Sequence, residues 1–331
     1  MEEDENLDAF PARGPLRKTK KRHKLLRKNS EQRQKLFKIA MDKNQTKPEV
    51  FSKLEEELRS LSGEEKLKLV QEVDDRGNTA LHYATKAGHL QLCKLLYASG
   101  ADLNKRGQNK MKPLQFAARY GDEKRPEDIW KCIEWIMKEY ERNERGQQKI
   151  GWVQRKNESE SFNDVRERDK YDFTILHHAI QNTNWEEKPV VVMKLIESKK
   201  FRITDTDRQG NTSLHLAAQF DKQENHQVFD VFLDNPNISD EDLAQCIEWR
   251  NRLGMTPLHV ACGIGNHDSV EQLIKEGREK RLDVQGIINS ADNNGSLPLN
   301  LAIESNNLEM MEILIKEGAR VSEDTIYAAA R

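Results

Sequence analysis

The sequence predicts an all-α protein, a solenoid of helix-turn-helix repeats joined by β-turn finger loops. The first observation is a short phrase that keeps returning after residue 77, in the forms GNTALHYA, KPLQFAA, FTILHHA, GNTSLHLAA, GMTPLHVA and GSLPLNLA. The second is an amphipathic stretch behind such phrases, as at 90–96 and 308–315, with apolar residues at helical spacing. The third is a hydrophobic share of only 36% with a mean hydropathy of −0.87, which suits an extended, surface-rich architecture.

Each phrase has the features of a repeat that begins with a helix. A turn containing Gly leads to Thr, which suits an N-cap, and Pro can open the helix because its missing N–H is not needed there. Leu and Ala then face the neighbouring repeat, and pairs such as Ala117-Ala118 let helices approach closely. Gly100 and Gly318 follow the second helices, where left-handed backbone favours glycine. The phrase is identified as the ankyrin-repeat signature, which implies a scaffold that binds proteins and not an enzyme.

Residues 1–48 are predicted to form a disordered arm that is first acidic and then basic. Between residues 13 and 38 there are 12 Lys/Arg and one acid, so this segment carries +11 and the rest of the chain −13, within a total of −2. Three alternatives stay open for the arm: a solvated or self-docking segment, an anionic membrane-surface contact, and a nuclear-import or nucleic-acid patch. The candidate contacts for an anionic lipid or nucleic acid are Lys18, Lys20, Lys21, Arg22 and Lys24.

The body divides into a cap and an array. Residues 49–76 have apolar residues at helical spacing and predict a helical cap or a degenerate first repeat. Residues 77–331 contain about six repeats, whose key leucines are separated by 33, 62, 38, 44 and 41 residues, against an ideal of about 33. These leucines are Leu81, Leu114, Leu176, Leu214, Leu258 and Leu299.

The excess length is expected in loops, because a longer helix would break the stacking between repeats. Its largest part is a charged, polar insertion near 141–170. Residues 322–331 resemble the first helix of a truncated last repeat, so the array is expected to continue beyond this chain. The alternative is a polar terminus that folds back as an irregular cap.

The residues that could carry chemistry are explained better by structure. Histidine recurs directly after the key Leu, which favours hydrogen bonds to neighbouring turns over catalysis. The string DTDRQG at 205–210 resembles the start of a calcium-binding loop, but its twelfth position is Leu216, where a bidentate Glu is required. No motif predicts a catalytic residue, a metal, a cofactor or a small-molecule substrate.

Four single cysteines are expected to be reduced packing residues, with a redox-sensing thiol as the alternative: Cys93, Cys132, Cys246 and Cys262.

Residues 273–304 carry a more specific resemblance. This stretch, LIKEGREK, a spacer, and then IINSADNNGSLPLNLAIE, is similar to TRPA-type (transient receptor potential) cation channels, which have an extended inter-repeat loop in their cytosolic N-terminal array. A basic segment ahead of the repeats is also similar to that family. The resemblance implies the N-terminal cytosolic part of an ion channel, at the cytosolic face of a membrane, in contact with protein partners or other parts of the same channel.

The competing prediction is a free-standing cytosolic or nuclear scaffold. The acidic start has no apolar signal region after it, which predicts that the chain begins in the cytosol. No apolar run is long enough to cross a bilayer, so these residues would not form the pore of a channel.

Overall fold

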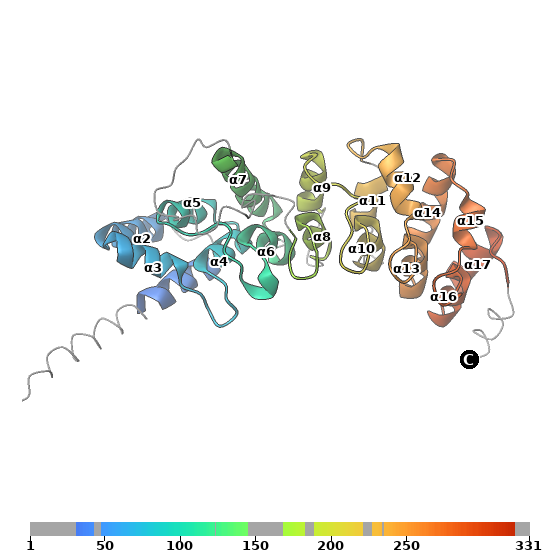
Figure 1. Cartoon of the computed structure of the whole chain (residues 1–331), viewed down its shortest axis with the longest axis horizontal. Helices are drawn as coiled ribbons and strands as arrows, with labels where there is room; N and C mark the ends of the chain where they lie inside the picture. Colours follow the sequence, from blue (N-terminus) through green and yellow to red (C-terminus); the bar gives the residue numbers. More distant parts are fainter. Residues whose placement is uncertain are drawn as a thin grey trace, which may run out of the picture.

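The helices form an elongated row in the computed structural model, from α2 at the left to α17 at the right (Figure 1). The structure describes residues 31–42, 48–122, 124–144, 168–182, 189–220, 227–233 and 235–321. Within these ranges the molecule is helical, and Val73 and Thr79 form an isolated antiparallel bridge. The prediction of an all-α solenoid is confirmed. The helices are α2 (Pro48–Ser60), α3 (Gly63–Gln71), α4 (Ala80–Lys86), α5 (Leu90–Ala98), α6 (Pro113–Tyr120), α7 (Pro126–Glu144), α8 (Ile175–Ile180), α9 (Val190–Glu197), α10 (Ser213–Phe220), α11 (Gln227–Leu233), α12 (Asp240–Glu248), α13 (Pro257–Ile264), α14 (His267–Glu279), α15 (Val284–Ile288), α16 (Pro298–Glu304) and α17 (Leu308–Lys316), with a short 3-10 turn at Gln108–Lys110.

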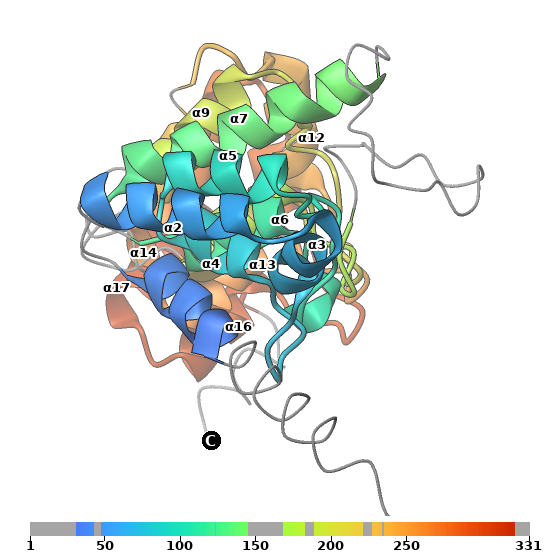
Figure 2. The same cartoon turned by 90° about the vertical axis from the view of Figure 1, so that its left-hand side faces the viewer.

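The repeats stack in two layers. The inner layer is α4, α6, α8, α10, α13 and α16, each of which contacts the next. The outer layer contains α5, α7, α9, α11, α14 and α17, each packed against its own inner helix (Figures 1 and 2). Helix α3 contacts α4 at the N-terminal end of the row, so α2 and α3 occupy the stretch expected to be a cap or a degenerate repeat. The inner layer brings the recurring phrases into register.

The repeated phrase folds as its residue types predict. Thr79, Thr174 and Thr256 are N-caps of inner helices, and Pro opens α6, α13 and α16. The alanine pairs of α6 and α10 have no exposed surface, which permits close packing of the layers. Gly100 and Gly318 have φ angles of 98° and 91°, so both helix ends use the left-handed backbone expected there.

The expectation that all excess length lies in loops is wrong. Part of it forms helix: α7 has 19 residues, α14 has 13, and α12 and α15 are additional helices between repeats. Outer helices can extend because the inner layer sets the stacking, so extra turns at their ends leave the inner register unchanged. Helix α12 contacts α10, α13 and α14, and therefore adds to the packed body.

The expected disordered arm is also wrong for its last part. Residues 31–41 are helical, and Leu36 and Ala40 have 1% and 0% of their surface exposed. The helix has apolar residues on one face, and this face packs on the start of the inner layer, where the ring centroids of Phe37 and Tyr83 lie 6.0 Å apart.

Of the 141–170 insertion, residues 141–144 belong to α7 and 168–170 to a finger loop. Residues 1–30, 145–167 and the predicted last helix at 322–331 lie outside the described residues.

Candidate interaction surface

The finger loops are tight turns held by one side chain each. In the loop before α10, Asp207 Oδ1 accepts the backbone N–H groups of Gln209 and Asn211, at 2.8 Å each. Asp169, Asn251 and Asp292 make the same pair of contacts in other loops. The turn therefore uses the carboxylate of Asp207, as the interpretation of the 205–210 string requires, and no three His, Cys, Asp or Glu side chains gather as a metal site within the described ranges.

Glycine is needed where adjacent loops approach each other. Gly254 has a φ of 75°, and a Cβ added there would lie 2.3 Å from Asn293 Oδ1 and 2.8 Å from Asn293 N. Gly295 has a similar φ of 83°, but nothing lies within 4 Å of its added Cβ. The first position requires glycine for backbone conformation and for space, whereas the second requires it for conformation alone.

The recurring histidines join consecutive repeats. His82 Nδ1 accepts the backbone N–H of Thr79 at 3.1 Å, and its Nε2 lies 3.2 Å from the carbonyl oxygen of Met111 in the next loop. Because Nδ1 accepts, the proton is on Nε2, which donates to that carbonyl. The same arrangement links His177 to Asp205, His215 to Met255 and His259 to Ser290, at 3.1, 3.0 and 3.1 Å. The predicted structural role of these histidines is confirmed.

The electrostatic environment keeps these imidazoles neutral. Burial disfavours the charged form and lowers the pKa of His82 and His215 to about 4 and that of His177 to about 3. Burial also lowers the pKa of His259. A neutral ring with its proton on Nε2 can both cap its own helix and reach the neighbouring turn, so the bridge requires the unprotonated form.

A ladder of backbone hydrogen bonds connects the tips of the finger loops. The N–H of Lys170 donates to the carbonyl of Asn109 at 3.4 Å, Arg208 to Tyr171 at 3.1 Å, Arg252 to Gln209 at 2.9 Å, and Asn293 to Leu253 at 2.9 Å. In the loops that contain Lys170, Arg208 and Arg252, each of these residues donates its backbone N–H to the preceding loop. The carbonyl of the residue directly after it accepts a backbone N–H from the following loop. The ladder therefore places Lys170, Arg208 and Arg252 at equivalent positions of consecutive loops.

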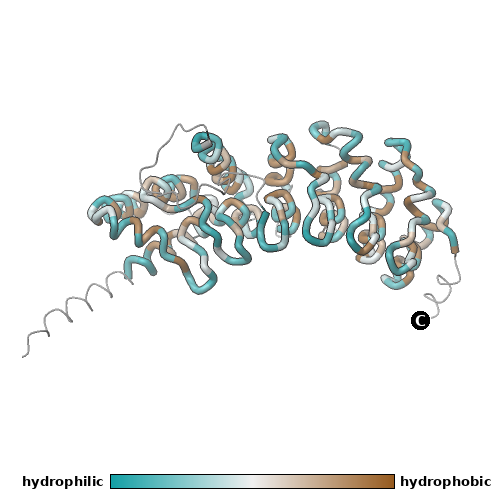
Figure 3. Tube along the Cα trace, in the orientation of Figure 1, coloured by the Kyte–Doolittle hydropathy of each residue, from teal (hydrophilic) through white to brown (hydrophobic). Residues whose placement is uncertain are grey.

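The finger edge is a row of exposed side chains. Lys170, Arg208 and Arg252 are exposed, and two apolar side chains lie beside them: Tyr171 is 41% exposed and Leu253 is 59% exposed. Figure 3 shows these loops as a hydrophilic lower edge, while apolar residues concentrate between the layers. A row of outward-pointing side chains on a rigid backbone can contact another macromolecule across several repeats at once.

A buried pair lies behind this edge. Asp169 Oδ2 is 3.1 Å from His178 Nε2, and their side chains are 1% and 3% exposed. Burial alone would raise the pKa of Asp169, but His178 and the backbone N–H groups of Tyr171 and Phe173 outweigh it and lower this pKa. Burial lowers the pKa of His178. The pair holds the base of one loop against α8.

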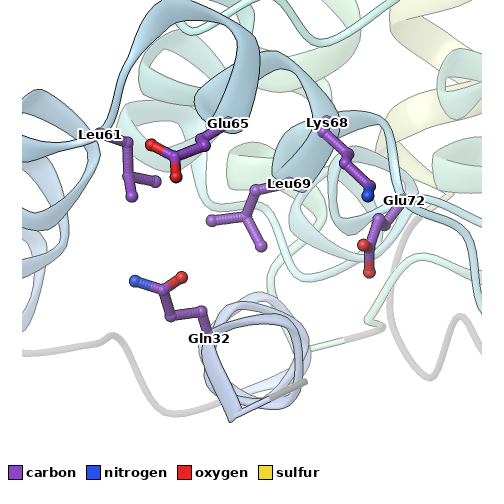
Figure 4. Close-up of a pocket in the computed structure, with 6 residues that line it drawn as sticks. All are labelled: Gln32, Leu61, Glu65, Lys68, Leu69 and Glu72. Atoms are coloured by element: carbon purple, nitrogen blue, oxygen red, sulfur yellow. The ribbon is translucent and has the colours of Figure 1, made fainter. Parts of the chain in front are cut away.

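A small pocket lies between the 31–41 helix and α3. Its residues are Gln32, Leu61, Glu65, Lys68, Leu69 and Glu72 (Figure 4). Glu65 caps α3 together with Ser62, and Glu72 forms an ion pair with Arg33 at 3.3 Å. Glu65 therefore stabilises the start of α3, and Glu72 ties the 31–41 helix to the end of α3, so the pocket is explained as a gap between packed elements.

The cysteines are all free and buried, as expected for packing residues. Burial raises the pKa of Cys246 to about 12 and raises that of Cys262 as well, so neither thiol ionises readily near neutral pH. Cys93 and Cys132 Sγ lie 4.0 Å apart between α5 and α7.

The candidate contacts predicted from the sequence, Lys18, Lys20, Lys21, Arg22 and Lys24, lie outside the described residues. The fingertip residues Lys170, Arg208 and Arg252 were not singled out from the sequence. Their signal is nevertheless present, because each directly follows the Asp or Asn that closes its turn, in DKYD, DRQG and NRLG. An alignment of the repeats on that turn residue would have found them.

Comparison with known families agrees with the repeat geometry. A family model described as ankyrin repeats (3 copies) matches residues 53–147 and 223–325. The matched residues make up more than half of the chain, and the first range begins inside α2. No curated protein matches the chain.

Proposed function

Because this chain belongs to the ankyrin-repeat family, we propose that it is a protein-binding module that holds its partner along the finger edge. The observation that carries the proposal is the backbone ladder, which fixes exposed side chains of consecutive loops in one register. Ankyrin repeats are interaction modules, and the family match is not to a catalytic one. Binding would use area spread over several repeats, since each loop offers only a few side chains.

Two exposed leucines allow a matched test of this surface. Leu253 lies at a fingertip and Leu308 at the start of α17, and they are 59% and 67% exposed. The tagged full chain would be purified from its source cells as wild type, Leu253→Asp and Leu308→Asp, with co-purifying proteins quantified against the bait. Loss of a partner with Leu253→Asp alone supports the finger edge. Equal retention by all three proteins would contradict it.

We propose, as the finer function, the cytosolic N-terminal part of a TRPA-like cation channel, with a free-standing cytosolic or nuclear scaffold as the alternative. The support for the channel is the resemblance of residues 273–304 and of the basic segment before the repeats. The segment between α14 and α16 contains α15, so the extended connection has helical structure. Among the helices that the structure describes, none is both long and apolar enough to span a membrane.

The size and fractionation of the native polypeptide distinguish these alternatives. An antibody raised against residues 141–170 would detect a much larger protein in the membrane fraction if the channel proposal is correct. A band near 38.4 kDa in the supernatant would contradict the channel and support the scaffold.

In both cases the anionic-partner role of the basic arm is a separate proposal. It is tested by comparing lipid and nucleic-acid binding with and without charge removal at Lys20 and Lys21.

A further inference from the structure

Three consecutive finger loops present exposed cations at their tips. The charged groups of Lys170, Arg208 and Arg252 form no ion pair with any described residue, and Lys170 Nζ lies 5.4 Å from the centre of the Tyr171 ring. We refer to these three residues as the fingertip strip. Their positive charges are available to an external anion.

Three of the four acids in these loops are already engaged. The Asp169 and Asp207 side chains accept backbone N–H groups in their turns and are buried, and Asp205 pairs with Arg168 at 3.4 Å. Across residues 168–173, 202–211 and 249–255, all of which the structure describes, Asp172 is the one exposed carboxylate. The exposed surface of these loops is therefore positive, although the chain outside residues 13–38 carries −13.

The spacing of the strip is set by the stacking of the repeats. The ladder holds the three residues in register, and packed inner helices lie about 8–10 Å apart. A polyproline II segment has three residues per turn and a rise of about 3.1 Å per residue, so every third side chain faces the same way about 9 Å further on. A carboxylate at every third residue of such a segment therefore recurs on the same length scale as the packed inner helices.

We propose that the fingertip strip binds an extended acidic segment of a partner protein that has a carboxylate at every third residue. Arg208 and Arg252 can each form a bidentate pair with a carboxylate, and Lys170 supplies a point charge. The exposed Tyr171 and Leu253 side chains contact apolar residues between the acids. This inference rests on the proposed protein-binding function and specifies the chemistry of the partner.

The same residues favour a peptide over a nucleic acid. A single-stranded nucleic-acid site combines cations with aromatic platforms for successive bases. At the three equivalent tip positions the residues beside the cations are Tyr171, Gln209 and Leu253, of which one is aromatic.

The test uses the full chain and two labelled synthetic peptides of identical composition. One has Glu at every third position with Pro and Ala between, and the other has its Glu residues in a single run. Fluorescence anisotropy is expected to show about tenfold tighter binding of the periodic peptide. Arg208→Ala is expected to weaken that binding by about tenfold, because a charge-assisted hydrogen bond is lost. Arg202→Ala, an exposed arginine in the same loop and outside the strip, is the matched control and is expected to have no effect.

Each other outcome overturns the inference. Equal binding of the two peptides, or equal losses in Arg208→Ala and Arg202→Ala, would show non-specific attraction. Tighter binding of a thymidine oligonucleotide than of the periodic peptide, with loss in Arg208→Ala, would assign the strip to nucleic acid. No binding of either peptide would exclude an acidic partner of this kind. The Leu253→Asp purification tests the protein-binding function separately, because it assumes nothing about the partner's charge pattern.

Discussion

His177 Nε2 lies 3.1 Å from the backbone carbonyl oxygen of Asp205, and this contact joins the inner helix α8 to the finger loop of the following repeat. The other ring nitrogen, Nδ1, accepts the N–H of Thr174 at 3.1 Å. One buried side chain therefore accepts a hydrogen bond from the N-cap of its own helix and donates one to a neighbouring turn. Four such histidines connect successive repeats, so the stability of the stack and the register of the finger edge depend on the same residues.

Replacement of His177 by Ala should destabilise the protein. The change leaves a buried backbone donor at Thr174 and a carbonyl at Asp205 without their partner, and each such loss costs about 1–3 kcal/mol. Urea unfolding followed by circular dichroism should show a total loss of about 2–4 kcal/mol. His267→Ala is the control, since His267 forms only a partly exposed pair with Asp268, at 3.0 Å. Similar losses in both variants would contradict the bridging role.

Stability should fall as the pH falls below about 6.5. The native histidines stay neutral because burial lowers the pKa of His82 and His215 to about 4 and that of His177 to about 3, whereas the unfolded chain binds protons near pH 6.5. Unfolding therefore takes up protons between about pH 6.5 and pH 4, and each adds about 1.4 kcal/mol per pH unit to the slope. His177→Asn should make this slope shallower by one proton. An unchanged slope would show that His177 titrates normally in the native protein.

Two glycines with the same backbone conformation should respond differently to Ala. Gly295→Ala places a Cβ in open space at positive φ and should cost about 1 kcal/mol. Gly254→Ala adds a collision with Asn293 to the same strain and should cost about 1–3 kcal/mol more. Equal unfolding midpoints for the two variants would mean that the loops do not approach each other as closely as the ladder requires.

The N-terminal helix should contribute to global stability. Leu36 is buried, with 1% of its surface exposed, so Leu36→Ala should lower the free energy of unfolding by about 2–4 kcal/mol. Lys38 is exposed on the same helix, and Lys38→Ala should change it by less than about 0.5 kcal/mol. If Leu36→Ala also has no effect, residues 31–41 do not belong to the folded body.

The fold was predictable because the repeated phrase encodes both its own helix start and its contact with the next repeat. Thr79, His82 and Ala84 each have one structural role, and that role recurs with the phrase. The added helices α12 and α15 were not predicted, since short stretches between repeats have no repeat pattern to identify them. Residues 31–41 were misassigned because a high density of Lys and Arg concealed one apolar face.

The interaction surface was less accessible from sequence. Lys170, Arg208 and Arg252 are separated by 38 and 44 residues, and only the ladder brings them together. A run of like charges can be recognised in a sequence because its residues are contiguous. A row with one residue from each repeat can be recognised only after the repeats are superposed on their turn residues. The contiguous charges of the basic arm therefore predict an anionic contact from sequence alone, whereas the row of cations on the finger loops does not stand out in the sequence.

Position-specific photo-crosslinking tests the finger edge most directly. A photoreactive amino acid would replace Gln209, an exposed fingertip residue whose loss leaves the three cations in place, or Lys131, an exposed residue of the outer helix α7. After irradiation of the source cells, protein adducts are expected at position 209 and not at position 131. Adducts at position 131 with none at position 209 would contradict a binding surface on the finger loops.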